Sequence, residues 1–127
     1  MTIFVFGNPL LEHDALAPSL VKTLSKSFPQ VTFNITDPNE DFPPPGVRHP
    51  IILDAVKGLR EVSILRFRDL KSLEKSPVSP HDYDLLMHLS LLKKMDRIDE
   101  ITIIGIPYGT VINNLTGKVN QAISSLL

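Results

Sequence analysis

The stretch that most constrains the fold is Ile3 to Phe6, an uninterrupted apolar run near the start of the chain. The run stops at Gly7, and a polar turn follows. Apolar residues then recur at helical spacing, at Leu16, Leu20, Val21 and Leu24. A continuous apolar strand that leads into an amphipathic helix is typical of a buried strand in a parallel sheet. The opening therefore predicts an α/β protein with a helix from Ala15 to Phe28.

The remaining segments extend this pattern. Alternating apolar residues predict one-sided strands at 31–37 and 62–68, and nearly continuous apolar runs predict buried strands at 51–56 and 101–106. The connection at 57–60 is too short for a helical crossover, so 62–68 is predicted to run antiparallel to its predecessor. Further helices are predicted at 79–95 and 115–127, and the proline-rich stretch Pro38–Pro50 is predicted to be an irregular loop. We therefore expect a single domain over residues 1–127, a three-layer α/β/α sandwich.

Composition excludes several classes of function. The chain has no cysteine, which rules out disulfides, thiolate metal sites, iron–sulfur ligation and a cysteine nucleophile. The formal net charge of -1 gives no basic footprint for nucleic acid. There is no apolar run long enough to span a bilayer and no basic leader at the amino terminus. The sequence therefore predicts a cytoplasmic protein that binds neither nucleic acid nor membrane.

Three residues at the ends of separate segments are candidates for chemistry. Asp14 lies in the turn after the first strand, Asp54 near the end of the third, and His81 in the first turn of the helix that begins at Ser79. The carboxyl ends of neighbouring parallel strands are where open α/β sheets bind ligands. The helix dipole disfavours the imidazolium form of His81, and a neutral imidazole beside two carboxylates suits zinc, nickel or a similar ion.

Each candidate also has a structural interpretation. Asp14 could cap the first helix, and His81 could be a solvent-exposed residue of a helix terminus. Asp54 interrupts an otherwise apolar strand, so its carboxylate needs a partner or a ligand. Three residues scattered along a chain form a weak motif by themselves.

Several stretches occur in the order in which the hydrogenase maturation proteases carry them, and together they cover most of the chain. They are GNPLLEHDALA, PIILDAV followed by SILRFRD, VSPHDYDLL and ITIIGIP. The chain thus resembles a divergent branch of that family. The resemblance implies a mixed five-stranded sheet in the order 2-1-3-5-4 with strand 4 antiparallel. It also implies an endopeptidase that removes the carboxyl-terminal peptide of a nickel–iron hydrogenase large-subunit precursor after nickel insertion.

The resemblance further implies the roles of the candidate residues. Asp14, Asp54 and His81 would contact the nickel that the substrate supplies, a site that other divalent metals are able to occupy. Asp14 and Asp54 would be the catalytic residues of a metal-dependent, aspartic-type endopeptidase. Its partner would be the large-subunit precursor, and the enzyme is expected to be a monomer.

The chain departs from the family pattern at two points. His13 and Ala15 replace an acid and a glycine of the first turn, and Asp37-Pro38-Asn39-Glu40 stands where the family commonly has Asp-Gly-Gly-Thr. The second departure leaves open a non-proteolytic protein that binds the loaded precursor as a checkpoint. A flavodoxin-like phosphate or nucleotide binder is a third interpretation, but no glycine-rich phosphate loop is present.

Overall fold

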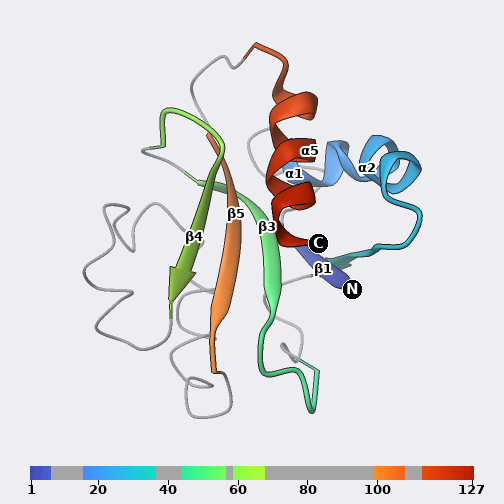
Figure 1. Cartoon of the computed structure of the whole chain (residues 1–127), viewed down its shortest axis with the longest axis vertical. Helices are drawn as coiled ribbons and strands as arrows, with labels where there is room; N and C mark the ends of the chain where they lie inside the picture. Colours follow the sequence, from blue (N-terminus) through green and yellow to red (C-terminus); the bar gives the residue numbers. More distant parts are fainter. Residues whose placement is uncertain (7–15, 37–43, 57–58, 68–98, 108–112) are drawn as a thin grey trace.

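A mixed five-stranded sheet forms the centre of the protein, seen in a computed structural model that describes residues 1–6, 16–36, 44–56, 59–67, 99–107 and 113–127 (Figure 1). Its strands are β1 (Thr2–Phe6), β2 (Thr32–Thr36), β3 (Ile51–Val56), β4 (Ser63–Phe67) and β5 (Ile101–Pro107). Their order across the sheet is β2-β1-β3-β5-β4. The predicted order and the five predicted strands are therefore confirmed.

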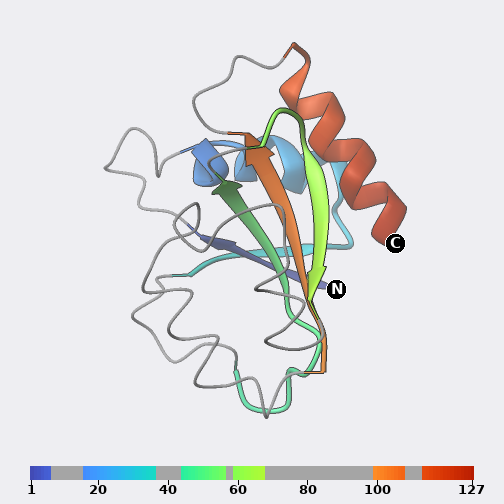
Figure 2. The same cartoon turned by 90° about the vertical axis from the view of Figure 1, so that its left-hand side faces the viewer.

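β4 runs opposite to its neighbour, whereas the other strand pairs are parallel. In Figure 2, the arrowhead of β4 (yellow-green) points in the opposite direction to the arrowheads of β3 (green) and β5 (orange). The turn between β3 and β4 leaves no room for a crossover helix, so the chain can only reverse its direction. The antiparallel orientation predicted for this strand is thus confirmed, and the short connection before it is the physical reason.

Three helices lie together on one side of the sheet (Figure 1): α1 (Leu16–Ser19), α2 (Val21–Ser27) and α5 (Leu115–Leu126). α5 matches the helix predicted at 115–127. The helix predicted at 79–95, which would form the layer on the opposite face, lies outside the described residues. Among the described helices, none combines the length and hydropathy that a bilayer-spanning segment requires.

The first helical region differs from the single helix predicted for Ala15 to Phe28. It is divided at Leu20, whose backbone N–H donates to the Ala17 carbonyl at 3.1 Å, a bond across three residues instead of four. The carbonyl of Leu16 accepts a bond from the hydroxyl of Ser19 at 2.6 Å. A serine hydroxyl competes with the backbone in this way and interrupts regular helix geometry. The prediction of a single uninterrupted helix over this region is therefore wrong.

The core lies between the sheet and these three helices. It joins Ile3 and Val5 of β1, Leu53 of β3 and Ile104 of β5 to buried residues of the helices, namely Ala17, Leu24, Val119 and Ile123. Side chains of a strand alternate between faces, so Phe4, Ile52 and Ile103 point to the other face. These three are also buried. The central strands are therefore buried on both faces, as their continuous apolar sequence predicted.

The proline-rich connection before β3 is described from residue 44 onward. It contains no regular element there, and a turn closes where the Val47 N–H donates to the Pro44 carbonyl at 3.1 Å. Gly46 within this turn has a φ of 87°, a conformation that glycine adopts without steric cost. The irregular loop predicted for Pro38–Pro50 is confirmed in this part, and its earlier residues lie outside the described ranges.

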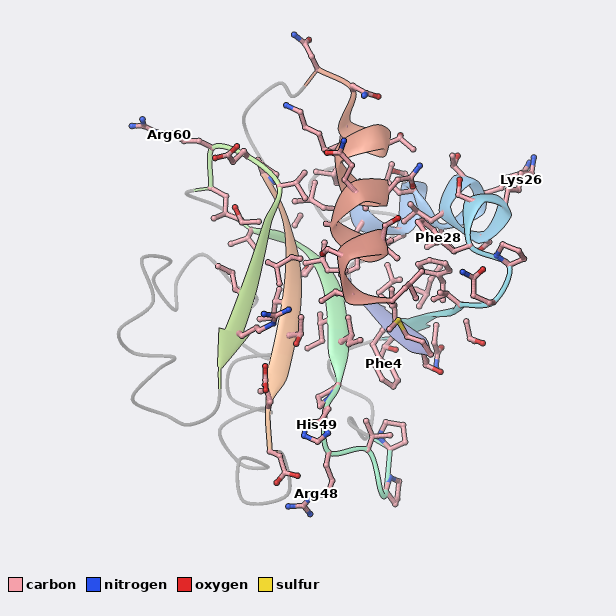
Figure 3. The ribbon with its side chains drawn as sticks, viewed as in Figure 1. Phe4, Lys26, Phe28, Arg48, His49 and Arg60 are labelled. Atoms are coloured by element: carbon pink, nitrogen blue, oxygen red, sulfur yellow. The ribbon has the colours of Figure 1, made fainter. Side chains whose placement is uncertain are left out.

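A polar clamp joins the segments that lead into β3 and β5. The Arg48 guanidinium donates two bonds to the Asp99 carboxylate, at 2.8 and 2.7 Å, and the Asp99 N–H donates to the Arg48 carbonyl at 2.8 Å. Figure 3 places Arg48 and His49 at one end of the sheet and Arg60 near the opposite end. The guanidinium holds the pKa of the Asp99 carboxyl below its ordinary value, because the hydrogen bond favours the charged form.

A core substitution tests the packing. Replacing Ile104 with Ala should lower the free energy of unfolding by about 2–5 kcal/mol, since it opens a cavity in a fully buried site. The control is Ile35→Ala on β2, where the side chain is 48% exposed and the loss should stay within about 0.5 kcal/mol. Urea unfolding measures both variants. Equal losses would contradict the assignment of the core.

The clamp between Arg48 and Asp99 predicts that the free energy of unfolding depends on pH in the acidic range. Because the pKa of Asp99 is lower in the folded chain than in the unfolded chain, its contribution is complete above the ordinary value of about 3.9. That contribution should be lost as the pH falls through the lower folded value. Both Asp99→Asn and Arg48→Gln should flatten this part of the profile, measured by urea unfolding at a series of pH values. An unchanged acid profile in both variants would contradict the clamp.

Candidate functional site

Asp54 lies in the second half of β3 and is the one buried charged residue in the part of the chain that the structure describes, at 8% exposure. Its neighbour Leu53 packs into the helix-covered core, so alternation directs Asp54 to the opposite face. This position confirms the prediction that the carboxylate of an otherwise apolar strand is buried. A carboxylate in such a position can serve as a metal ligand or as a base.

The register of the sheet shows what lies beside Asp54. Asp54 pairs with Gly105 of β5, and Gly105 pairs with Ser63 of β4. On the other side, Leu53 pairs with Val5, which puts Asp54 level with Phe6 of β1. Asp54 thus has an aromatic neighbour in one strand and a residue without a side chain in the other.

The space over Gly105 is filled by a residue from the turn after β3. A Cβ built on Gly105 would lie 2.6 Å from Leu59 Cδ1 and 3.4 Å from Val56 Cγ2. The Leu59 side chain therefore packs directly onto the backbone beside Asp54, and only glycine allows this approach. As a result, apolar groups lie on both sides of the carboxylate within the sheet.

Asp54 also lies at the point where the connections of the sheet diverge. β1 continues through α1 and α2 to β2 on one side, whereas β3 is followed by β4 and β5 on the other side. Ligands of open α/β sheets bind in the crevice that this reversal creates at the carboxyl ends of the strands. The sequence prediction for this region depended on β1 and β3 being neighbours, and the pairing of the strands confirms that they are.

The other two candidate residues, Asp14 and His81, lie outside the described ranges. The helix that begins two residues after Asp14, α1, packs against both β1 and β3. Within the described ranges, no three His, Asp or Glu side chains form a group able to hold a metal ion. The convergence of Asp14, Asp54 and His81 therefore stays a prediction.

Sequence reasoning missed Gly105 and Leu59 as components of this region. Gly105 gave a usable signal, since it interrupts the apolar run ITIIGIP, and a glycine inside a strand often marks a close approach of another group. Leu59 gave none. Its position over Gly105 depends on the pairing of β3 with β5, which are separated by a long stretch of sequence.

The contact of Leu59 with Gly105 can be tested by a double-mutant cycle. Gly105→Ala should lower the free energy of unfolding by about 1–3 kcal/mol, because the added methyl group overlaps Leu59 Cδ1. In the double variant Gly105→Ala/Leu59→Ala, the space vacated by Leu59 should offset part of this loss. Chemical denaturation of the four proteins gives the coupling energy. Additive losses would show that the two residues are not in contact.

Comparison with known proteins gives one match of fold. No family model and no curated protein matches the chain. Among solved structures, the chain is similar to the hydrogenase 2 maturation peptidase from Thaumarchaeota archaeon SCGC_AB-539-E09. The two chains are 20% identical with a TM-score of 0.54, and the match covers 98% of this chain and 93% of that chain. The resemblance carried by the sequence motifs is confirmed at the level of the fold: the chain folds as a divergent counterpart of a hydrogenase maturation peptidase.

Proposed function

We propose that the chain is an endopeptidase that removes the carboxyl-terminal peptide from a nickel-loaded precursor of a nickel–iron hydrogenase large subunit. The burial of Asp54 beside the point where the strand connections diverge is the observation that supports this most strongly. A structural neighbour described as a hydrogenase maturation peptidase, aligned over nearly the whole chain, adds to it. So does the order of the sequence stretches around Asp14, Asp54 and His81.

In this proposal the nickel ion belongs to the substrate. Asp14, Asp54 and His81 bind it through two carboxylates and one imidazole, a donor set that suits nickel and zinc. The burial of Asp54 fits such a role, because a carboxylate removed from water gains more from a nearby cation than an exposed one does. Recognition of the ion makes cleavage wait until the precursor has been loaded.

The hydrolysis then needs a water molecule and a base. A divalent ion held by these residues would polarise the scissile carbonyl and lower the pKa of a nearby water molecule. Asp14 or Asp54 accepts the proton of this water as its oxygen bonds to the carbonyl carbon. The carbon–nitrogen bond then breaks, and the proton passes to the departing amine, so that the products are a carboxylate and a free amino terminus.

The checkpoint protein is the second candidate function. It is favoured by the segment Asp37-Pro38-Asn39-Glu40, which replaces the glycine-rich motif of the family. A protein of this kind would bind the loaded precursor through the same three residues and would not cut it.

Asp54→Asn removes the negative charge of the side chain and keeps its shape. The variant should fold normally, bind nickel or zinc at least about tenfold more weakly, and leave the precursor at full length. His81→Ala should behave in the same way. Calorimetry measures the metal affinity, and mass spectrometry of the large subunit measures its processing. The matched control is Asp99→Asn, the same exchange at the opposite end of the sheet, which should leave processing unchanged.

The wild-type chain decides between the two functions. Incubation with nickel-loaded precursor from the same genome should shorten the large subunit, and nickel-free precursor should stay intact. If the chain binds the loaded precursor without shortening it, the checkpoint function is correct. If it neither binds nor shortens the precursor, both proposals are wrong.

A further inference from the structure

Two polar residues are buried in the part of the chain that the structure describes, Thr36 at 6% exposure and Asp54 at 8%. Thr36 ends β2 and pairs with Phe6 of β1, and Asp54 lies level with Phe6 on the other side of β1. Val5, the residue before Phe6, packs into the helix-covered core, so this row of three side chains points to the opposite face. The two buried polar side chains therefore share one row and one face near the carboxyl ends of the strands.

The hydrogen bond of the Thr36 hydroxyl adds little to the sheet. The hydroxyl donates to the Asn34 carbonyl at 3.1 Å. The Thr32 N–H donates to the Met1 carbonyl at 2.9 Å, so by alternation the backbone groups of Asn34 also face β1. The Asn34 carbonyl thus already belongs to the ladder between β1 and β2, and the hydroxyl is a second donor to it. Valine has nearly the same shape and buries no polar group, so packing alone does not account for the hydroxyl.

The direction of this bond sets the kind of ligand group that Thr36 can bind. A hydroxyl has one hydrogen to donate and lone pairs with which to accept. Because the hydrogen is directed at the Asn34 carbonyl, the oxygen of Thr36 can only accept a bond from a ligand. An ionised carboxylate such as that of Asp54 is likewise an acceptor. These two groups of the row therefore suit a ligand with an N–H or O–H donor at one end and a cation at the other, and they do not suit a phosphate.

We propose that Thr36 is a substrate-binding residue of the Asp54 site, and that its hydroxyl oxygen accepts a hydrogen bond from a main-chain N–H of the precursor. This inference rests on the proposed function, which supplies the identity of the peptide, whereas the need for a donor follows from the bond to Asn34. A main-chain N–H recurs at every residue except proline. The contact therefore fixes the path of the peptide without selecting its sequence.

The spacing of the row suits an extended peptide that crosses the strands. Thr36 and Asp54 lie on β2 and β3, with β1 between them, so two strand spacings separate them, about 10 Å. An extended chain advances about 3.3 Å per residue and covers this span in about three residues. The N–H bound by Thr36 therefore lies about three residues from the part of the precursor that is held at Asp54.

Thr36→Val removes the acceptor and keeps the shape of the side chain. With nickel-loaded precursor, kcat/KM should fall about three- to tenfold, the effect of one neutral hydrogen bond. The loss should appear as a raised KM with kcat unchanged, because the bond is made equally in the bound substrate and in the transition state. The affinity for nickel alone, measured by calorimetry, should stay within about twofold, since two strand spacings separate Thr36 from Asp54.

Two matched variants separate the hydroxyl from the packing. Thr36→Ser keeps the hydroxyl and loses the methyl group, so kcat/KM should stay within about twofold of the wild-type value. Thr32→Val makes the same exchange at an exposed position of the same strand and face, about 13 Å towards the amino end, and should leave processing unchanged. In urea unfolding, the midpoint of Thr36→Val should lie at or above that of the wild type, because valine suits a buried strand position.

NMR of the threonine methyl groups tests the contact in the unmutated chain, whatever the stability of the variants. On addition of nickel-loaded precursor, the Thr36 methyl signal should shift, because a peptide N–H then lies at the hydroxyl on the same carbon atom. The Thr32 methyl signal is the internal control and should keep its position. Inorganic phosphate is the probe of the opposite ligand chemistry and should shift neither signal.

The outcomes separate this inference from the proposed function. If the wild-type chain processes the precursor and Thr36→Val does so equally well, or if Thr36→Ser loses as much as Thr36→Val, the hydroxyl does not bind the peptide and the function stands. A Thr36 methyl signal that shifts with phosphate and not with the precursor also overturns the inference. If the wild-type chain does not bind the precursor at all, the proposed function is wrong and the inference falls with it.

Discussion

The burial of β1, β3 and β5 on both faces is the constraint on which the rest of the structure depends. Leu53 packs against the helices, and Ile52 on the opposite face is equally buried. A strand of this kind has no solvent face that could take a polar side chain without cost. Asp54 lies in the second half of β3, near the end of the strand at which open α/β sheets bind ligands. The burial of the Asp54 carboxylate is thus a consequence of the packing of β3 on both faces.

Much of this architecture follows from local sequence, because continuous apolar runs and a short connection leave few alternatives. The strand at Ile51–Val56 and the reversal before Ser63 were predicted on these grounds. The interruption at Leu20 was not, because it depends on a small difference between a hydroxyl bond and a backbone bond. The contact of Leu59 with Gly105 could not be predicted either. It exists only in the register that pairs β3 with β5, and no local pattern encodes that register.

The two ends of the sheet differ in the groups that lie there. At the amino ends of β3 and β5, Arg48 and Asp99 join the chain by side-chain and backbone bonds together. The clamp ties together the segments that lead into the two strands, and the six residue pairs of β3 with β5 set the pairing of Asp54 with Gly105. At the carboxyl ends, Asp54 and Gly105 lie side by side in β3 and β5, and the residues that follow β1, β2 and β5 lie outside the described ranges.

The two ends of the edge strand β4 differ in the side chains that they carry. Arg66 is exposed, and its Nε lies 3.9 Å from Glu100 Oε1, so a charged pair marks the end of β4 that is distant from Asp54. Charged side chains on an edge disfavour unselective strand pairing. Ile64, closer to the other end of β4, pairs with Ile104, so its side chain lies on the helix-covered face. The apolar end of β4 therefore belongs to the helix-covered face of the sheet, whereas Asp54 lies on the opposite face.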